Sequence, residues 1–156
     1  MNKAEAIRVI DEKQALLDDV NDSIWEYAET AFQEFKSMDK LCEALEQEGF
    51  KVEKGVGDIP TAFTGTYGHG KPVIGLLGEF DALSGLSQVG GCPEKKALVP
   101  GAAGHGCGHN CLGTAALAAA WAAKEFMEKN HLSGTVRYYG CPGEEYGSAK
   151  AFIDRK

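Results

Sequence analysis

The alternation of apolar and polar positions divides the chain into a helical first third and an α/β remainder. Apolar residues recur at three- and four-residue spacings through residues 1–30, with charged residues between them, which predicts helix. A second helix is expected to begin near Ser37, whose hydroxyl is suited to cap it, and to stop at Gly49. We expect the break between the two helices within residues 22–35.

After Gly49 the pattern becomes that of strands. Residues 50–53 alternate between apolar and polar positions, and residues 62–67 are rich in Thr and aromatic side chains. Residues 73–78 form an unbroken apolar run, which is typical of a central strand covered on both faces. A last strand is expected over residues 134–140.

Two further segments complete the expected fold. Residues 84–109 form a long glycine-rich loop, and a structureless loop of that length inside a compact domain is usually functional. An alanine-rich helix over residues 112–129 follows it. The order of helix, helix, strands, helix and strand predicts an α/β fold with parallel strand pairing around the alanine-rich crossover.

Composition narrows the class of protein. The chain has 156 residues, of which 44% are hydrophobic and 25% charged, as expected for one globular domain. A net charge of −7 makes nucleic acid an unsuitable partner, since phosphate binding requires a basic face. The excess acids lie in residues 1–50 and are typical of a solvated helix face.

Targeting features point to the cytoplasm. The chain holds no apolar run of membrane-spanning length, and its charged N-terminus lacks the apolar core of a secretory signal. We therefore expect no membrane association. The five cysteines are then expected to be reduced cytoplasmic thiols, some of them candidate metal ligands.

The densest group of chemically active residues is His-Gly-Cys-Gly-His over residues 105–109. The Cys107 thiolate and the His109 imidazole suit a borderline metal such as zinc, and the glycines let the backbone turn tightly. A flexible loop with incidental His and Cys remains the alternative, because paired C-x-x-C motifs are absent. Three further residues are candidate donors: His105, Cys111 and Cys92.

A second group is the adjacent pair Glu144 and Glu145. Neighbouring carboxylates repel, so cation binding or opposite roles would stabilise them, one as metal ligand and the other as proton shuttle. A solvated pair in the first turn of a helix is the alternative. The position of these residues favours a metal site. Each group follows a predicted strand or precedes a predicted helix: Glu79 and Asp81, the 105–109 loop, and this pair. Ligands bind at the sheet edge where such ends meet.

Other residue patterns are weaker indications of a functional site. Cys107 and His109 form a candidate thiol nucleophile and base, but side chains two residues apart are rarely placed for that and no third orienting group is evident. His69 and His131 occupy expected loop positions and are predicted to lie at the surface. Trp25 lies on a predicted helix at core-like spacing.

The motifs together resemble those of the M20 family of metallopeptidases and amidohydrolases. The closer likeness is to its branch of aminoacylase-like and indole-acetyl-amino-acid hydrolases, and it covers essentially the whole chain. The segments that carry the resemblance are WEYAET (25–30), FQEF (32–35), GEFDAL (78–83), GHGCGHN (104–110) and PGEE (142–145).

This resemblance implies a fold, a cofactor and roles for individual residues. The implied fold is a zinc-exopeptidase-like mixed sheet flanked by helices. Cys107, His109 and Glu145 would be metal ligands, Glu144 the general base toward the attacking water, and Asp81 an active-site residue supporting the ligands. The implied cofactor is a divalent metal, Zn or Mn, with two ions in the complete enzyme. The implied reaction is hydrolysis of the amide bond of a small N-acyl or aroyl amino acid.

Two departures from the family pattern stand out. Asn110 follows the loop histidine where many members of the branch have Asp. Family members are also more than twice as long and add a dimerisation domain and later histidine ligands. Residues 1–156 are therefore expected to be the N-terminal portion of the catalytic domain, an incomplete fold that is inactive alone. Full-length relatives are expected to be homo-oligomers or to pair with a homologous subunit.

A different class of function is also open. The chain would then be a non-catalytic fragment that binds a metal or a partner and needs another chain to complete its sheet and its site. An exposed sheet edge would favour this hypothesis.

Overall fold

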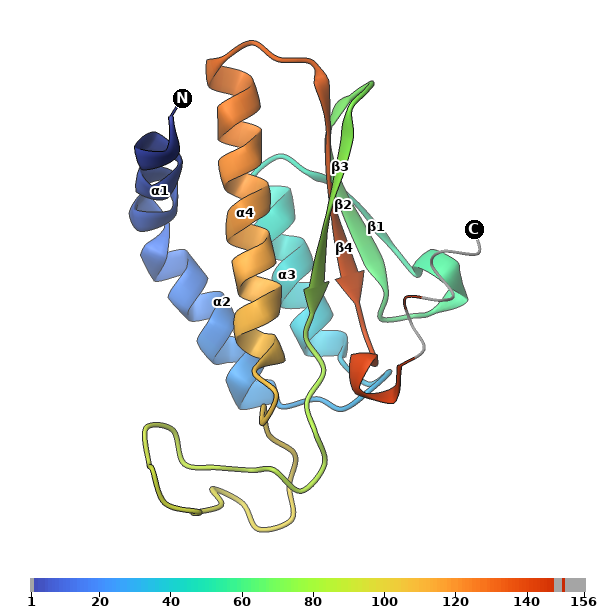
Figure 1. Cartoon of the computed structure of the whole chain (residues 1–156). Coiled ribbons are helices and arrows are strands. Elements are labelled where there is room, and N and C mark those ends of the chain that lie inside the picture. The colour runs from blue at the N-terminus through green and yellow to red at the C-terminus, as the bar shows by residue number, and fades with distance from the viewer. Residues whose placement is uncertain (1, 148–149, 151–156) are drawn as a thin grey trace.

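A computed structural model describes residues 2–147 and residue 150 of the chain. Helices cover one face of a four-stranded sheet (Figure 1). The helices are α1 (Lys3–Glu12), α2 (Gln14–Tyr27), α3 (Phe35–Gln47) and α4 (His109–Lys129). The strands are β1 (Lys51–Lys54), β2 (Phe63–His69), β3 (Val73–Glu79) and β4 (Gly134–Cys141). Two short 3₁₀ turns are η1 (Val56–Asp58) and η2 (Glu144–Tyr146).

The sheet has the order β1-β2-β4-β3 and is mixed. β1 pairs with β2 and β2 with β4 in antiparallel fashion, whereas β3 and β4 are parallel and joined through α4. The parallel register ends with Glu79 opposite Cys141, so both strands finish at the same edge of the sheet. This arrangement confirms the predicted α/β fold, with a mixed sheet flanked by helices and parallel pairing around the alanine-rich helix.

The core lies between the sheet and the α3–α4 layer. Its largest buried side chains are Trp121 of α4, Tyr138 of β4, Phe63 of β2 and Phe80, and the Phe63 ring packs against both Tyr138 and Phe80. Small residues let α4 lie close to the sheet. A side chain at Gly113 would come within 2.7 Å of the Glu79 backbone oxygen, so the start of α4 sits directly against the end of β3.

The helical first third differs from its prediction in two details. The expected helix over residues 1–30 is two helices, because the chain bends at Lys13 between α1 and α2. α3 starts at Phe35, and Ser37 is not its cap. The Ser37 amide and hydroxyl both donate to the Glu29 carboxylate at 2.9 Å, so a carboxylate from the preceding turn stabilises the first turn of the helix.

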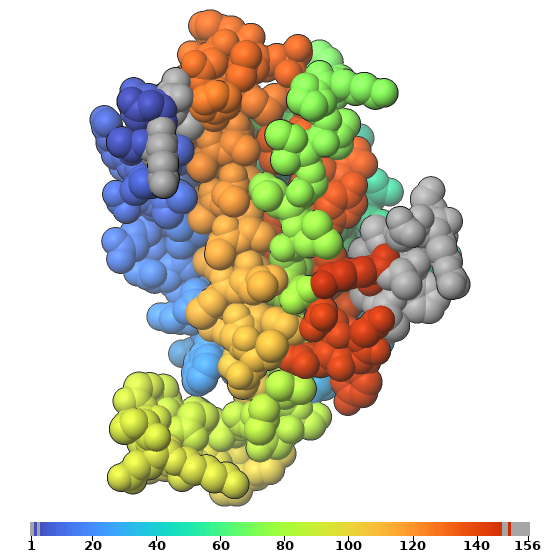
Figure 2. All heavy atoms as spheres, viewed as in Figure 1, coloured from blue at the N-terminus to red at the C-terminus, as the bar shows by residue number. Residues whose placement is uncertain are grey.

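The apolar run at residues 73–78 was expected to be a central strand, and this is wrong for the part of the chain that the structure describes. β3 is an edge strand, and Val73, Ile74 and Leu77 are about half exposed, at 53%, 53% and 52%. Figure 2 shows the strand on the open surface beside α4. An apolar run indicates that side chains on both faces of a strand are suited to burial. It does not indicate how many strands pair with that strand.

The glycine-rich loop between β3 and α4 follows its prediction. Residues 84–104 form a lobe that projects beyond the helices and the sheet (Figure 2). The two ends of the lobe meet at an isolated bridge between Leu83 and Gly104. Among the described residues, no helix has the length and apolar character needed to cross a membrane.

Candidate metal centre

Three chain segments meet at the edge where β3 and β4 end. β3 finishes at Glu79, α4 begins at His109, and β4 leads through Gly143 into η2, which starts with Glu144. The residue before α4, Gly108, has a φ of +83°, a conformation that favours glycine and lets Cys107 and His109 approach the same point. The fold thus gathers motifs that lie far apart in the sequence.

His109 lies at the centre of this group and is buried, with 3% of its surface exposed. Its Nδ1 atom is 2.9 Å from Oδ1 of Asp81. Its Nε2 atom is 3.2 Å from Oε2 of Glu79 and 3.6 Å from Oε2 of Glu144. Asp81 therefore accepts a hydrogen bond from Nδ1, while Nε2 faces two other carboxylates. A carboxylate behind the ring in this way is common at metal-binding histidines.

Two sets of donor atoms around His109 are close enough to hold a metal ion. In one set, the donor atoms of Cys107, His109 and Glu145 all lie within 4.8 Å of one another. In the other, those of Glu79, His109 and Glu144 do so. Sulfur, imidazole nitrogen and carboxylate oxygen form a mixed donor group that suits zinc and related divalent ions.

Asp81 also connects the histidine to the η2 turn. It is almost fully buried, and its Oδ2 atom accepts a hydrogen bond from the backbone N–H of Glu145 at 3.0 Å. One carboxylate therefore orients both the imidazole ring and the backbone that carries the adjacent glutamates. Because each oxygen of Asp81 has a separate partner, the side chain has a single preferred orientation.

The charges around the centre are mostly negative. Desolvation and the carboxylates of Glu145, Glu144 and Glu79 raise the pKa of the Cys107 thiol. Lys150 offsets part of this charge through an ion pair with Glu79. Oε1 of Glu145 is buried without a hydrogen-bond partner among the described residues, and a cation would satisfy it. The mixed donor atoms, the negative charge around them and the unpaired oxygen of Glu145 all fit a divalent metal.

The structure brings together every residue of the predicted site. Cys107, His109, Asp81, Glu144 and Glu145 all lie at this edge, and their roles remain predictions. Glu79 was grouped with Asp81 at the strand end but had no assigned role. Its contact with Nε2 of His109 now places it in the centre. Its position at the carboxyl end of a parallel strand was the signal.

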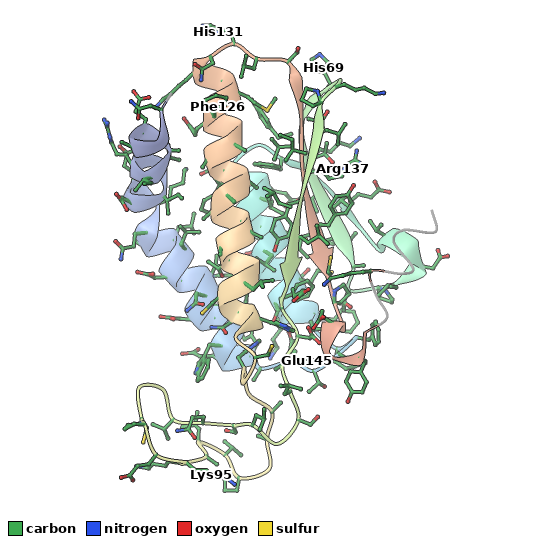
Figure 3. The ribbon with its side chains drawn as sticks, in the orientation of Figure 1. His69, Lys95, Phe126, His131, Arg137 and Glu145 are labelled. Carbon is green, nitrogen blue, oxygen red and sulfur yellow. The ribbon has the colours of Figure 1, made fainter. Side chains whose placement is uncertain are left out.

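Other candidate donors lie elsewhere. His105 is buried, its Nε2 atom is 2.9 Å from the Ile24 carbonyl oxygen, and its ring stacks on Trp25. Neither His105 nor the remaining cysteines belong to the donor groups found in the described residues. His69 and His131 are exposed at the opposite end of the molecule from Glu145 (Figure 3).

Asn110, the departure from the family pattern, has a structural partner. Its side-chain amide donates to Oδ1 of Asn21 at 2.9 Å and is buried at the start of α4. The contact ties the metal loop and α4 to α2.

A curated relative matches the chain closely. The chain is 56% identical over 138 residues to a subunit of p-aminobenzoyl-glutamate hydrolase from Escherichia coli (strain K12). The match covers 88% of this chain and 29% of that protein. The chain therefore spans less than a third of the length of this relative. No protein-family model matches the sequence.

Two crystal structures share the fold. A protein described as an aminohydrolase from methicillin-resistant Staphylococcus aureus superposes with a TM-score of 0.77 at 23% identity, covering 98% of this chain and 39% of that one. The YXEP protein of Bacillus subtilis, described as a dinuclear metal-binding peptidase from the M20 family, gives a TM-score of 0.70 at 22% identity, covering 91% and 39%.

Proposed function

We propose that this chain, which belongs to the M20 family of metallopeptidases and amidohydrolases, carries part of the catalytic centre of a metal-dependent amidohydrolase. The observation that carries the proposal is the environment of His109. Asp81 contacts Nδ1 of the ring from behind, while Glu79 and Glu144 face Nε2. A buried histidine held between carboxylates in this way is arranged for a cation.

Cys107, His109 and Glu145 are the proposed ligands of a divalent ion, Zn or Mn. Glu79 and Glu144 would lie close to a second ion in the complete enzyme, since they form a donor group with the same histidine. A bound ion would polarise the scissile carbonyl group and acidify the attacking water. Asp81 would keep His109 in the tautomer that presents Nε2.

Glu144 is the proposed general base. Its side chain is partly exposed, at 35%, and so can reach a substrate, whereas that of Glu145 is more buried, at 16%. One carboxylate is thereby open to solvent and its neighbour is directed inward, which allows the two to take different roles. Glu144 would accept a proton from the attacking water and pass it to the leaving amine.

The proposed substrates are N-acyl or aroyl amino acids such as p-aminobenzoyl-glutamate, which the E. coli relative is named for hydrolysing. That relative is called a subunit, which supports pairing with a homologous subunit or a second copy. We further propose that residues 1–156 are the N-terminal portion of a longer catalytic domain, since they cover 29% of the relative. All five cysteines are free thiols, which supports a cytoplasmic location.

One observation favours a second candidate function, that of a partner-binding fragment. The outer edge of β3 is apolar and unpaired among the described strands, with Val73, Ile74 and Leu77 exposed. Such an edge is a template for strand addition. Sedimentation analysis of the purified chain tests this candidate, because a stable monomer at high concentration would argue against it.

The decisive experiment for the amidohydrolase compares Glu144→Gln with wild type in the longest reading frame that contains these residues. The substrate is p-aminobenzoyl-glutamate, and the enzyme is loaded with Zn or Mn. We expect the variant to lose at least about 100-fold in turnover while it keeps its metal, as is typical for removal of a general base. Turnover within about tenfold of wild type would refute the assigned role.

A further inference from the structure

The connection between α2 and α3 lies directly against the η2 turn that carries Glu144 and Glu145. Two of its non-glycine residues, Ala28 and Phe32, have φ values of 42° and 62°. Left-handed conformations at such residues are costly and persist only where the surroundings hold them. The connection also bonds to the strand end, since the Ala82 amide donates to the Glu29 carbonyl oxygen at 2.8 Å.

Glu34, the last residue of this connection, reaches across the fold to the candidate centre. Its side chain is fully buried, and its Oε1 atom accepts a hydrogen bond from the Gly143 amide at 2.9 Å. Gly143 has a φ of +63° and directly precedes Glu144. The ring of Phe32 covers the same residue, because a Cβ atom at Gly143 would lie 2.6 Å from the ring.

Capping of α3 does not account for this carboxyl group. The free amides at the start of α3, those of Lys36 and Ser37, are already bonded to Glu29, so Glu34 is not needed as a side-chain cap. Besides the Gly143 amide, the backbone of Phe32 and the side chain of Thr61 lie close enough to stabilise its charged form. Burial raises the pKa of Glu34, which reflects the cost of keeping a carboxylate here.

We propose that Glu34 is a positioning residue whose bond to the Gly143 amide sets the direction in which Glu144 and Glu145 leave β4. The turn is then fixed at two backbone amides, Gly143 by Glu34 and Glu145 by Asp81. Both acceptors are buried carboxyl groups, so the η2 backbone cannot shift without losing one of them. The inference rests on the proposed function, in which these glutamates serve as general base and metal ligand.

The test uses three variants of the 156-residue chain and Co²⁺ as the probe metal. Glu34→Ala removes the acceptor, whereas Glu34→Gln keeps an amide oxygen for Gly143. Leu45→Ala, at the far end of α3 and also fully buried, controls for loss of stability alone. We expect Glu34→Ala to weaken Co²⁺ binding about 10- to 100-fold, the usual effect of losing a residue that supports metal ligands. Glu34→Gln and Leu45→Ala should bind close to wild type.

A second readout is amide hydrogen exchange at Gly143, followed by NMR. Exchange should accelerate in Glu34→Ala but not in Glu34→Gln or Leu45→Ala. Unchanged Co²⁺ affinity and unchanged Gly143 exchange in Glu34→Ala would overturn the proposal, as would an equal loss of affinity in Leu45→Ala. If Glu34→Ala does not fold, Glu34→Asp replaces it, since the shorter acid is withdrawn from Gly143 and should show the same effects.

These readouts separate this inference from the proposed function. If the wild-type chain binds no Co²⁺, residues 1–156 do not hold a metal by themselves, and the exchange rate of the Gly143 amide alone decides the role of Glu34. If the chain binds Co²⁺ but Glu34→Ala changes neither affinity nor exchange, the metal centre stands and the positioning role fails.

Discussion

The Nδ1 atom of His109 lies 2.9 Å from Oδ1 of Asp81. This contact leaves Nε2 as the ring nitrogen that is available to a metal ion. Nδ1 is also 3.2 Å from the Asp81 backbone oxygen, so one residue supplies two acceptors for the same N–H group. The ring is thereby held with Nδ1 toward Asp81 and Nε2 toward Glu79 and Glu144. The proposed metal centre therefore depends on this relationship as well as on its ligands.

The first prediction concerns Asp81 directly. Asp81→Ala should weaken Zn²⁺ binding about 10- to 100-fold, because the ring loses its orienting acceptor and the Glu145 amide loses its partner. Competition with a chromophoric chelator measures the change. Asp11→Asn, an exposed acid on α1, is the matched control and should bind Zn²⁺ as wild type does. Equal affinities for Asp81→Ala and wild type would show that metal binding by His109 does not depend on Asp81.

The second prediction uses the pH dependence of stability. Burial raises the pKa of Glu34, so the folded state binds this proton more tightly than the unfolded state. The stability contributed by protonated Glu34 is complete below the unfolded pKa, near 4.5, and is lost as the pH rises toward the higher folded value. Glu34→Gln removes this titration. Urea unfolding from about pH 4 to about pH 8 should therefore show a smaller decline for Glu34→Gln than for wild type, and parallel curves would contradict the prediction.

Much of this site follows from the order of the elements. A strand ending in Glu-Phe-Asp, a crossover helix and a second parallel strand ending before Glu-Glu must bring those ends to one edge, whatever the loop between them does. The resemblance to a family then supplied roles for the residues found there. Proximity could be predicted because it depends on topology, which hydrophobic periodicity reveals.

Three features could not be predicted, for physical reasons. The edge position of β3 depends on which strands pair, and an apolar run does not encode its neighbours. The break at Lys13 leaves the apolar spacing almost unchanged, so periodicity does not reveal it. The contact between Glu34 and Gly143 joins residues 109 positions apart through one backbone amide, which has no signature in the side-chain pattern.

The third prediction concerns the contact between α4 and β3. A methyl group at Gly113 would lie 2.7 Å from the Glu79 backbone oxygen, so Gly113→Ala must push the start of α4 away from the strand end. We expect a loss of about 1–3 kcal/mol in the free energy of unfolding, as for other overpacked cores. Zn²⁺ affinity should also fall, since His109 moves relative to Glu79. Ala119→Ser, an exposed change on the same helix, is the control and should alter neither quantity.

The last prediction concerns the apolar edge of β3. Because exposed, unpaired apolar strands favour edge-to-edge association, we expect the purified chain to self-associate as its concentration rises. Ile74→Lys should shift sedimentation toward the monomer, because a charge on the edge opposes strand addition and is costly to bury. Lys71→Glu, in the exposed turn before the strand, is the control for a change of charge outside the edge. A wild-type chain that stays monomeric would contradict this prediction, because the exposed edge of β3 would then not cause association. Association unaffected by Ile74→Lys would place the contact on another surface, such as the lobe of residues 84–104.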